Sequence, residues 1–275
     1  MDQAKLYSEF NNLQMRDDLY ILEKYWHLIK LPKKAMKVMD VGSGDGKFTV
    51  KHLVEKIPKF EKLVAVDISE SMTNFAKQNH VHENVEFLKF DIASQHIPDG
   101  FHNSFDYIFS FMCLHWVENQ RAAFKNIFEF LKRGADFFAV FVVHNPLTIA
   151  VRDLLESSRW KHYNHDKYWP GFQYGTNPKE ELQNLLTQTG FVNVRCHIEE
   201  MTYTFPNLES LDGFALSLNH VIVSEISIED REDYIREYLR IVRTLPSVTI
   251  RKEDGEGDET ATLAYKYFVA IGTKQ

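Results

Sequence analysis

The feature that most constrains this chain is a glycine-rich loop at residues 40–46, which reads Asp-Val-Gly-Ser-Gly-Asp-Gly. It follows a short apolar stretch at 36–41 and precedes residues 47–57, whose pattern predicts a helix. Glycines between a strand and a helix let the backbone approach a ligand closely. The spacing is G-x-G-x-G, and Lys47 stands where the dinucleotide fingerprint has its third glycine. The loop therefore predicts a nucleotide-type cofactor that is not a dinucleotide.

Strand patterns and helix patterns alternate on both sides of this loop. We expect strands at 36–41, 63–66, 85–90, 105–112, 137–143, 192–197 and 260–272. We expect helices at 5–30, 47–57, 69–79, 119–131 and 178–189, with Ser69 as an N-cap. Such alternation predicts an α/β fold, a mostly parallel seven-stranded sheet with helices on both faces. Ligands of such sheets bind at the carboxyl ends of the strands.

Two stretches depart from the alternation. Residues 145–177 are rich in aromatics, and residues 206–246 predict two amphipathic helices. The aromatics are Trp160, Tyr163, Tyr168, Trp169, Phe172 and Tyr174. We expect one domain over 1–275, with a core at about 30–144, 178–204 and 258–275 and a helical cap from 1–29, 145–177 and 205–246. The acidic run at 252–259 predicts a solvated turn before the last strand.

Composition excludes several classes of protein. A formal net charge of -7 argues against general nucleic-acid binding, which needs a basic surface. Two cysteines, Cys113 and Cys196, lack metal-ligand spacing and indicate a reduced, cytoplasmic protein without a metal site. The first residues lack the layout of a signal peptide, and no apolar run approaches the roughly 20 residues that span a bilayer.

Three carboxylates stand at the ends of three successive predicted strands: Asp40, Asp67 and Asp91. Asp67 comes 21 residues after Gly46, where a carboxylate can accept both hydroxyls of a ribose. Asp91 stands where a carboxylate can meet the amino group of an adenine. Each of these aspartates alone could simply cap a helix or form a turn. Together with the glycine loop, the three indicate one ligand site.

This arrangement resembles the class I methyltransferases, whose fold is Rossmann-like and whose cofactor is S-adenosylmethionine. The resemblance covers residues 36–144 well. It implies a cofactor site made of Asp40, Gly42, Ser43, Gly44, Asp45, Asp67, Ile68, Met72, Asp91, Ile92 and Ser110. For Ile68 and Ile92, ordinary core packing is nearly as good an interpretation.

The residues after the fourth predicted strand limit which chemical group can be the methyl acceptor. Residues 110–116 read Ser-Phe-Met-Cys-Leu-His-Trp, so the Asn/Asp-Pro-Pro-Tyr motif of base N-methylation is absent. No acidic set of the metal-dependent catechol type stands near this edge either. A carboxylate acceptor is already ionised at pH 7 and needs only hydrogen-bond donors in a dry pocket. Gln14 and Trp116 can supply neutral donors of that kind.

The resemblance then extends over nearly the whole chain. The segments Leu6-Tyr7, Asn12-Leu13-Gln14 and Arg16-Asp17, with Leu114-His115-Trp116 and residues 123–128, look like the insect juvenile hormone acid methyltransferases. These methylate the carboxylate of farnesoic acid or juvenile hormone acid and release S-adenosylhomocysteine. The resemblance implies that Gln14 and Trp116 bind the substrate carboxylate, while His115 either donates a third bond or merely packs. It also implies a small lipophilic acid as partner and an apolar cap over its tail.

Three alternatives stay open at this point. A fatty acid could replace the terpenoid acid. A carboxyl methyltransferase of the trans-aconitate or malonyl-thioester kind would need pocket arginines, for which Arg121, Arg152 and Arg159 are candidates. A non-catalytic module that binds an apolar ligand would be expected to have a damaged cofactor loop, and this loop is intact.

Overall fold

The computed structural model describes residues 12–144, 146–163, 175–252 and 259–275 of the chain. These form two compact units. Unit 1 comprises Met1–Val143, Pro170–Glu199 and Tyr267–Gln275, and unit 2 comprises His144–Trp169 and Glu200–Lys266. The long strands β6 and β8 contribute residues to both. The single domain expected from the sequence stays a prediction.

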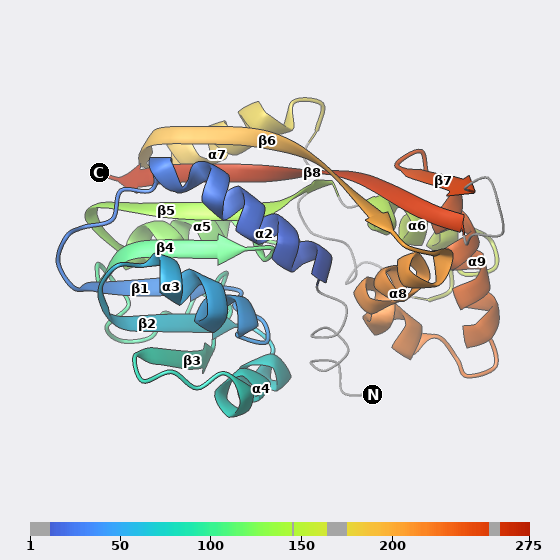
Figure 1. The fold of residues 1–275 in the computed structure, drawn as a ribbon, viewed down its shortest axis with the longest axis horizontal. Coiled ribbons are helices and arrows are strands. Elements are labelled where there is room, and N and C mark those ends of the chain that lie inside the picture. The colour runs from blue at the N-terminus through green and yellow to red at the C-terminus, as the bar shows by residue number, and fades with distance from the viewer. Residues whose placement is uncertain (1–11, 145, 164–174, 253–258) are drawn as a thin grey trace. The chain divides into compact units, whose positions relative to one another are not determined.

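The sheet has the strand order β3-β2-β1-β4-β5-β8-β6 (Figure 1). Its strands are β1 Met36–Val41, β2 Phe60–Asp67, β3 Val85–Lys89, β4 Phe105–Phe111, β5 Leu131–His144, β6 Phe191–Phe205 and β8 Glu259–Lys274. The pairs β1/β2, β2/β3, β1/β4 and β4/β5 are all parallel. The strand order reverses between β1 and β4, so the crevice at their carboxyl ends is where such a sheet binds ligands. The predicted α/β fold class is confirmed.

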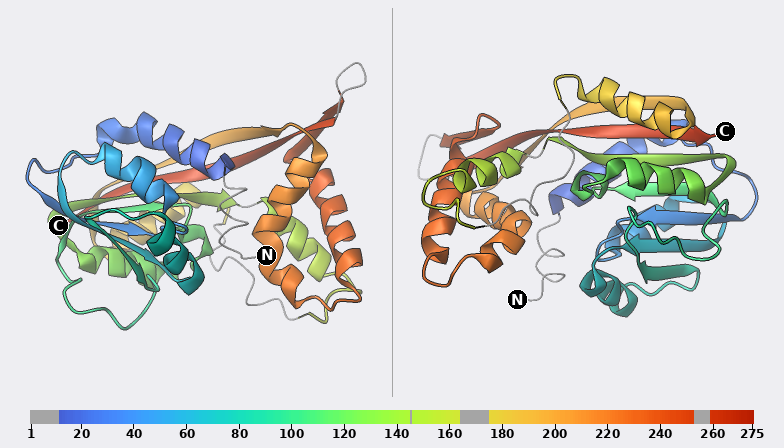
Figure 2. Two further views of the ribbon diagram at one scale, coloured as in Figure 1. Left: turned by 60° about the horizontal axis from the view of Figure 1, so that its bottom comes forward. Right: turned by 180° about the vertical axis from the view of Figure 1, so that it is seen from behind.

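Helices cover both faces of this sheet (Figures 1 and 2). They are α2 Asn12–Tyr25, α3 Val54–Lys56, α4 Glu70–Asn79, α5 Gln120–Phe130 and α7 Pro178–Thr189. Helix α2 lies on one face, and α5 and α7 cover the other. The predicted N-cap is confirmed, since the Ser69 hydroxyl accepts a bond from the Met72 amide at 3.3 Å. Helix α7 ends at Gly190, whose φ of +111° is the left-handed conformation that favours glycine there.

Two predicted helices differ in detail from the structure. The segment after the glycine loop is helical, but its middle, η2 Thr49–Leu53, is a π-helix. Such turns often occur at functional sites. Of the helix expected at 5–30, residues 12–25 are α-helical and Trp26–Leu28 form a 3₁₀ turn, η1. Leu6, Tyr7, Phe10 and Asn11 lie outside the described residues.

The core of unit 1 is rich in phenylalanine. All seven residues of β4 are buried, because helices cover both faces of a central parallel strand. The single acid of that strand, Asp106, accepts bonds from the Lys132 ammonium at 2.7 Å and the Lys37 amide at 3.0 Å. The fully buried phenylalanine rings are Phe105, Phe109, Phe124, Phe130, Phe137, Phe138, Phe141 and Phe191. This core holds the ends of β1 and β4 in fixed register.

Unit 2 contains three helices, α6 Pro146–Leu155, α8 Leu208–Glu225 and α9 Arg231–Thr244, and the strand β7 Val248–Lys252. Trp160 is fully buried, and its indole N–H donates to a carboxylate oxygen of Glu237 at 2.7 Å. The rings of Tyr234 and Trp160 meet edge to face with centroids 5.3 Å apart. The two helices expected within 206–246 are confirmed as α8 and α9.

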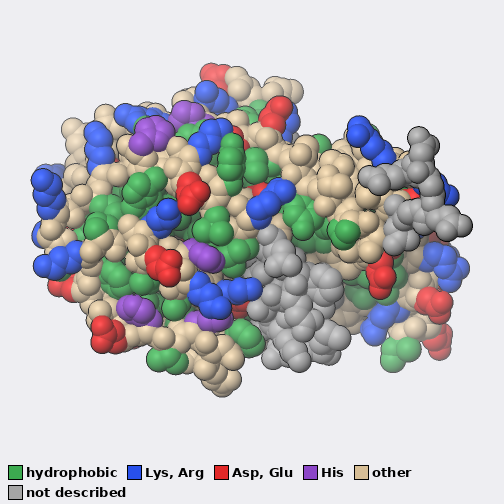
Figure 3. Space-filling view, viewed as in Figure 1, with side chains coloured by type: hydrophobic (Ala, Val, Ile, Leu, Met, Phe, Trp, Pro, Cys, Tyr) green, Lys and Arg blue, Asp and Glu red, His purple; other side chains and the backbone are tan. Residues whose placement is uncertain are grey.

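Neither α6 nor β7 was expected from the sequence. β7 pairs antiparallel with β8 and adds an eighth strand beside the seven expected. The acidic turn predicted at 252–259 falls mostly outside the described residues, as do Tyr168, Trp169, Phe172 and Tyr174. None of the helices in the described part of the chain is long and apolar enough to cross a bilayer. Lys and Arg side chains are spread over the surface visible in Figure 3, among acidic ones.

Candidate functional site

The glycine loop follows β1 in a backbone conformation that suits only glycine. Gly42, Gly44 and Gly46 have φ angles of +78°, +54° and +78°, in the left-handed region. A Cβ on Gly42 would lie 2.2 Å from the Cβ of Cys113, in the segment after β4. Position 42 therefore needs glycine both for its backbone angle and for the close approach of this segment.

Backbone bonds tie the loop to the end of β2. The amides of Gly42 and Ser43 both donate to the Val66 carbonyl, at 2.7 and 3.0 Å. Asp67 completes the link, because its two carboxylate oxygens accept from the Gly44 amide at 2.9 Å and the Ser69 amide at 2.8 Å. Burial raises the pKa of Asp67, and the two amide bonds oppose that rise. Each oxygen keeps a free lone pair that a ribose hydroxyl could use.

Asp40 lies at the end of β1 and is buried. Its Oδ2 accepts a bond from the hydroxyl of Thr49, in the π-helix, at 2.6 Å. Burial raises the pKa of Asp40 to about 7, against the Thr49 bond that lowers it, and the charge of Asp67 adds to the rise. A carboxyl that is half-protonated near neutrality and buried beside a glycine loop is typical of a functional site.

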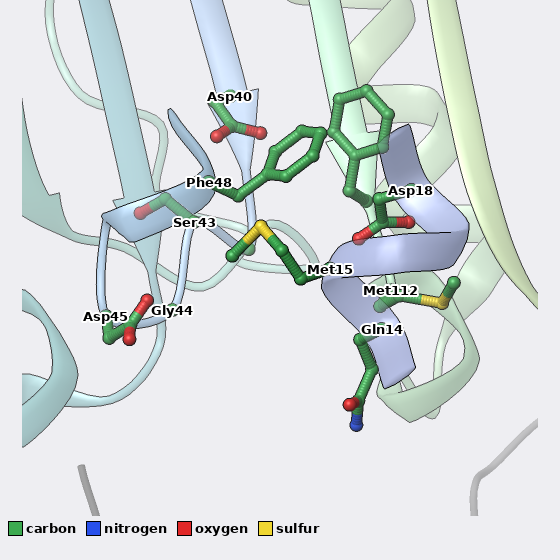
Figure 4. Close-up of a pocket in the computed structure, with 11 residues that line it drawn as sticks. Gln14, Met15, Asp18, Asp40, Ser43, Gly44, Asp45, Phe48 and Met112 are labelled. Atoms are coloured by element: carbon green, nitrogen blue, oxygen red, sulfur yellow. The ribbon is translucent and has the colours of Figure 1, made fainter. Parts of the chain in front are cut away.

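An open pocket lies where the glycine loop, the end of β4 and α2 meet (Figure 4). Its position at the strand-order reversal is the one that the topology predicts. Gln14 and Asp18 reach it from α2, one helical turn apart. Its lining residues are Gln14, Met15, Asp18, Asp40, Gly42, Ser43, Gly44, Asp45, Phe48, Phe111 and Met112.

Unsatisfied polar atoms gather in this pocket. Nine buried side-chain nitrogen or oxygen atoms lack a hydrogen-bond partner among the described residues. Four of the nine belong to pocket residues: Gln14 Oε1, Asp18 Oδ1, Ser43 Oγ and Asp45 Oδ2. Buried polar groups are normally hydrogen-bonded, so such a concentration indicates the place of a polar ligand.

The other predicted cofactor residues lie outside the pocket lining. Ile68 is 65% exposed directly after Asp67, which leaves its side chain free to flank a ligand. Ile92 packs in the hydrophobic core and Ser110 donates its hydroxyl to the Val41 carbonyl at 2.9 Å. Met72 is half-buried on α4. Asp91 is exposed, and its Oδ1 accepts the Ala93 amide at 2.8 Å.

His115 and Trp116 belong to a 3₁₀ turn, η3 Leu114–Trp116, after β4. The Gln120 amide holds this turn by donating to the Leu114 carbonyl at 2.8 Å. Burial lowers the pKa of His115 to about 3, so the imidazole is neutral at physiological pH. Trp116 is 45% exposed and lies against His115 with ring centroids 4.9 Å apart. The described structure therefore places Gln14, but not Trp116, in the pocket lining.

Sequence reasoning missed five lining residues: Met15, Asp18, Phe48, Phe111 and Met112. The spacing of Asp18 could have identified it, because it follows Gln14 by four residues and therefore lies on the same face of the helix. Met112 has a φ of +47°, a conformation that is uncommon for a residue with a side chain. Such a conformation has no sequence signal at methionine.

Comparison with known proteins shows which proteins this chain resembles. Residues 39–139 match the methyltransferase domain family. Juvenile hormone acid O-methyltransferase of Bombyx mori is 29% identical over 247 residues, which cover 89% of this chain and 87% of that protein. The enzyme of the same name from Drosophila melanogaster is 26% identical, over 100% of this chain and 93% of that protein. The chain thus carries a methyltransferase domain over residues 39–139 and is similar over most of its length to these two curated methyltransferases. Its predicted resemblance to the insect enzymes is confirmed.

A solved structure supports the fold of this methyltransferase. It is a putative methyltransferase from Bacillus halodurans, 17% identical, with a TM-score of 0.59 over 92% of this chain and 98% of that one. At this identity the likeness shows the fold alone. The cofactor is S-adenosylmethionine.

The pocket fits that cofactor in its chemistry. S-adenosylmethionine carries an ammonium group, a sulfonium and ribose hydroxyls. The lining offers three carboxyl groups, Asp18, Asp40 and Asp45, together with the glycine-loop residues 42–45. Within the described residues, no group of three or more His, Cys, Asp or Glu side chains has the arrangement of a metal site.

The three arginines that a polyacid substrate would need are engaged elsewhere. Arg121 donates to Gln188 at 3.3 Å, and Arg152 pairs with Asp153 at 3.4 Å. Arg159 pairs with Glu237 at 2.9 Å. None of these arginines is among the described residues that line the pocket.

Proposed function

We propose that this methyltransferase esterifies the carboxylate of a lipophilic acid, of the farnesoic acid or juvenile hormone acid type. The observation that carries the proposal is the position of Gln14. Its side-chain amide, which carries two N–H donors, lies at the cofactor pocket and extends away from Asp40 (Figure 4). A neutral amide beside the methyl donor is what a carboxylate acceptor needs. The names of the two insect relatives support the same acceptor.

Methylation of a carboxylate requires few catalytic groups from the protein. The bound cofactor supplies an electrophilic methyl group on its sulfonium. A substrate carboxylate is ionised at pH 7, so one of its oxygens forms the new bond to the methyl carbon without a base. The carbon–sulfur bond breaks, its electron pair stays on sulfur, and the products are a methyl ester and S-adenosylhomocysteine. Since no proton moves, the protein's task is to orient the carboxylate and exclude water.

In this proposal the Gln14 amide N–H and the Trp116 indole N–H hold the carboxylate. Both donors are neutral, so they orient the oxygen without the loss of nucleophilicity that a full positive charge would cause. His115 is also neutral, because its pKa lies near 3, and its buried ring fixes Trp116 by contact. The role of His115 is therefore to position Trp116. The proposal includes a cytoplasmic location, as the sequence predicts.

The partnered arginines weigh against a small polyacid as substrate. A di- or tricarboxylate leaves charges beyond the reacting carboxylate, and those charges need cationic partners when they are buried. The candidate cations are engaged elsewhere, because Arg121 donates to Gln188 while Arg152 and Arg159 pair with Asp153 and Glu237. A monocarboxylate with an apolar remainder makes no such demand, and its burial is worth roughly 0.8 kcal/mol per CH₂.

A direct assay tests the proposal. The protein is incubated with labelled S-adenosylmethionine and, separately, farnesoic acid, juvenile hormone acid, a medium-chain fatty acid or trans-aconitate. Esters are identified by mass spectrometry. We expect methyl esters of the terpenoid acids and little from trans-aconitate. A preference for trans-aconitate would refute the lipophilic acid, and a preference for the fatty acid would move the proposal to that substrate.

Variants at the two donors test the carboxylate assignment. We expect Gln14→Ala and Trp116→Ala to lower kcat/KM about ten- to hundred-fold, the loss of one hydrogen bond to a charged group, with nearly unchanged affinity for S-adenosylmethionine. Gln188→Ala serves as the matched control, because Gln188 is exposed on α7. Normal turnover in both donor variants would contradict the proposed roles.

A further inference from the structure

Asp18 is a buried acid that the proposed chemistry does not use. It lies on α2, is 5% exposed and points its carboxyl group toward the space between the helix and the glycine loop (Figure 4). Its Oδ1 has no hydrogen-bond partner among the described residues. Burying a carboxyl group in this way is costly unless something satisfies it. Asp18 therefore indicates a ligand group that carries a hydrogen-bond donor.

The neighbouring acid, Asp17, shows that a buried carboxyl group on this helix can be fully hydrogen-bonded. Asp17 is also buried, but it accepts bonds from the Arg16 guanidinium at 2.6 Å and the Tyr267 hydroxyl at 3.0 Å. Its charge is thus matched within the protein. Asp18, one residue later, faces the pocket and has no cation beside it there.

The whole pocket has an excess of acid. Asp18 on α2, Asp40 on β1 and Asp45 in the loop line it, and Lys, Arg and His are absent from the described lining. Asp40 is bonded to Thr49, and Asp45 accepts the Lys47 amide at 3.0 Å. The described lining offers these carboxyl groups no cationic side chain, so a positively charged ligand group would be matched here.

We propose that Asp18 binds the ammonium group of S-adenosylmethionine. The cofactor has two cationic centres, but only the ammonium has N–H bonds, and only a donor can satisfy Asp18 Oδ1. Burial, with the charges of Asp17 and Asp40, raises the pKa of Asp18, so its charged form is costly here unless a cationic donor contacts it. This assignment concerns the cofactor, and it stands whichever acid is methylated.

Calorimetric titration with three ligands tests the assignment. S-adenosylmethionine and S-adenosylhomocysteine both carry the ammonium, whereas 5′-methylthioadenosine lacks the amino-acid part. We expect Asp18→Asn to weaken the first two about ten- to hundred-fold and equally, and to leave the third within two-fold. Glu23→Gln is the matched control, because Glu23 is an exposed acid on the same helix and pairs with Lys56 away from the pocket.

Other patterns of affinity would overturn the proposal. An equal loss of affinity for all three ligands would mean that Asp18 maintains the structure of the pocket and does not contact the ammonium group. Weakening of S-adenosylmethionine alone would mean that it senses the sulfonium, and no change would exclude contact.

A wild-type measurement covers the case in which Asp18→Asn does not fold. Calorimetric titrations of the wild-type protein at pH 6, in two buffers of different ionisation enthalpy, give the number of protons that are released when each ligand binds. We expect more protons released by S-adenosylhomocysteine than by 5′-methylthioadenosine. Equal release would overturn the assignment.

Discussion

The buried carboxyl of Asp40 predicts that the cofactor-free protein loses stability as the pH rises from about 4 to neutrality. Its pKa is about 7 in the folded state, against 3.8 for an unperturbed aspartate. The folded state therefore holds this proton more tightly than the unfolded state does. The stabilisation is fully present below the unfolded pKa and is lost as pH rises from about 4 to 7. At about 1.4 kcal/mol for each ten-fold change, the whole effect is about 4 kcal/mol.

Asp40→Asn isolates this effect, because asparagine keeps the shape and an acceptor for Thr49 but does not titrate. We expect the free energy of unfolding of the variant, relative to wild type, to rise by about 2.5 kcal/mol between pH 5 and pH 8. Urea denaturation followed by circular dichroism, without cofactor and at constant ionic strength, measures it. Exposed Asp99→Asn should show no such rise. A relative stability that is the same at both pH values would refute the reasoning.

Thr49→Val provides a second test of the same argument. The Thr49 hydroxyl favours the charged form of Asp40, so its removal should move the pH range of the stability loss upward. The same urea series, extended to pH 9, measures that shift. A shift toward lower pH would contradict the assignment of Asp40 as the titrating group.

Three further predictions concern other parts of the chain. His115 should stay neutral from pH 8 down to pH 5 because burial lowers its pKa to about 3, and imidazole chemical shifts that titrate near pH 6.5 would contradict this. Gly42→Ala should lower the thermal unfolding temperature by several degrees, since its Cβ would overlap Cys113, and Cys113→Gly should restore only part of the loss because the backbone strain remains. Trp160→Phe should cost about 1–3 kcal/mol in urea unfolding, because Glu237 loses its indole donor, and an unchanged midpoint would count against that bond.

The parts of the site that follow a strand directly could be predicted from the sequence. The glycine loop carries its signal in spacing, and Asp67 falls at a strand end whose position the alternation fixes. Gln14 was a candidate donor from its residue type, but only the resemblance assigned it to the substrate carboxylate, because nothing in its own helix says which way the helix faces. The structure places it at the pocket.

Features that depend on long-range packing could not be predicted. Asp18 reaches the pocket because α2 packs beside the loop 22 or more residues later in the chain, and no local pattern records that contact. The strand β7 is mostly exposed and has no clear alternation, so its pairing with β8 had no local signal. Ile92 matched a cofactor position in the family pattern, but in this chain it is packed in the core.

The two amide bonds of Asp67 have a consequence for the energetics of ligand capture. They hold Gly44 and Ser69 in place while no ligand is present, so the loop reaches its bound shape when the chain folds. The entropic cost of ordering this loop is then incurred when the chain folds. Ligand binding orders the loop little further, so that cost hardly lowers the affinity for the ligand. Affinity for the cofactor and rigidity of the loop thus depend on the same carboxylate. A substitution that loosens the loop should slow the capture of the cofactor even where every direct contact to it survives.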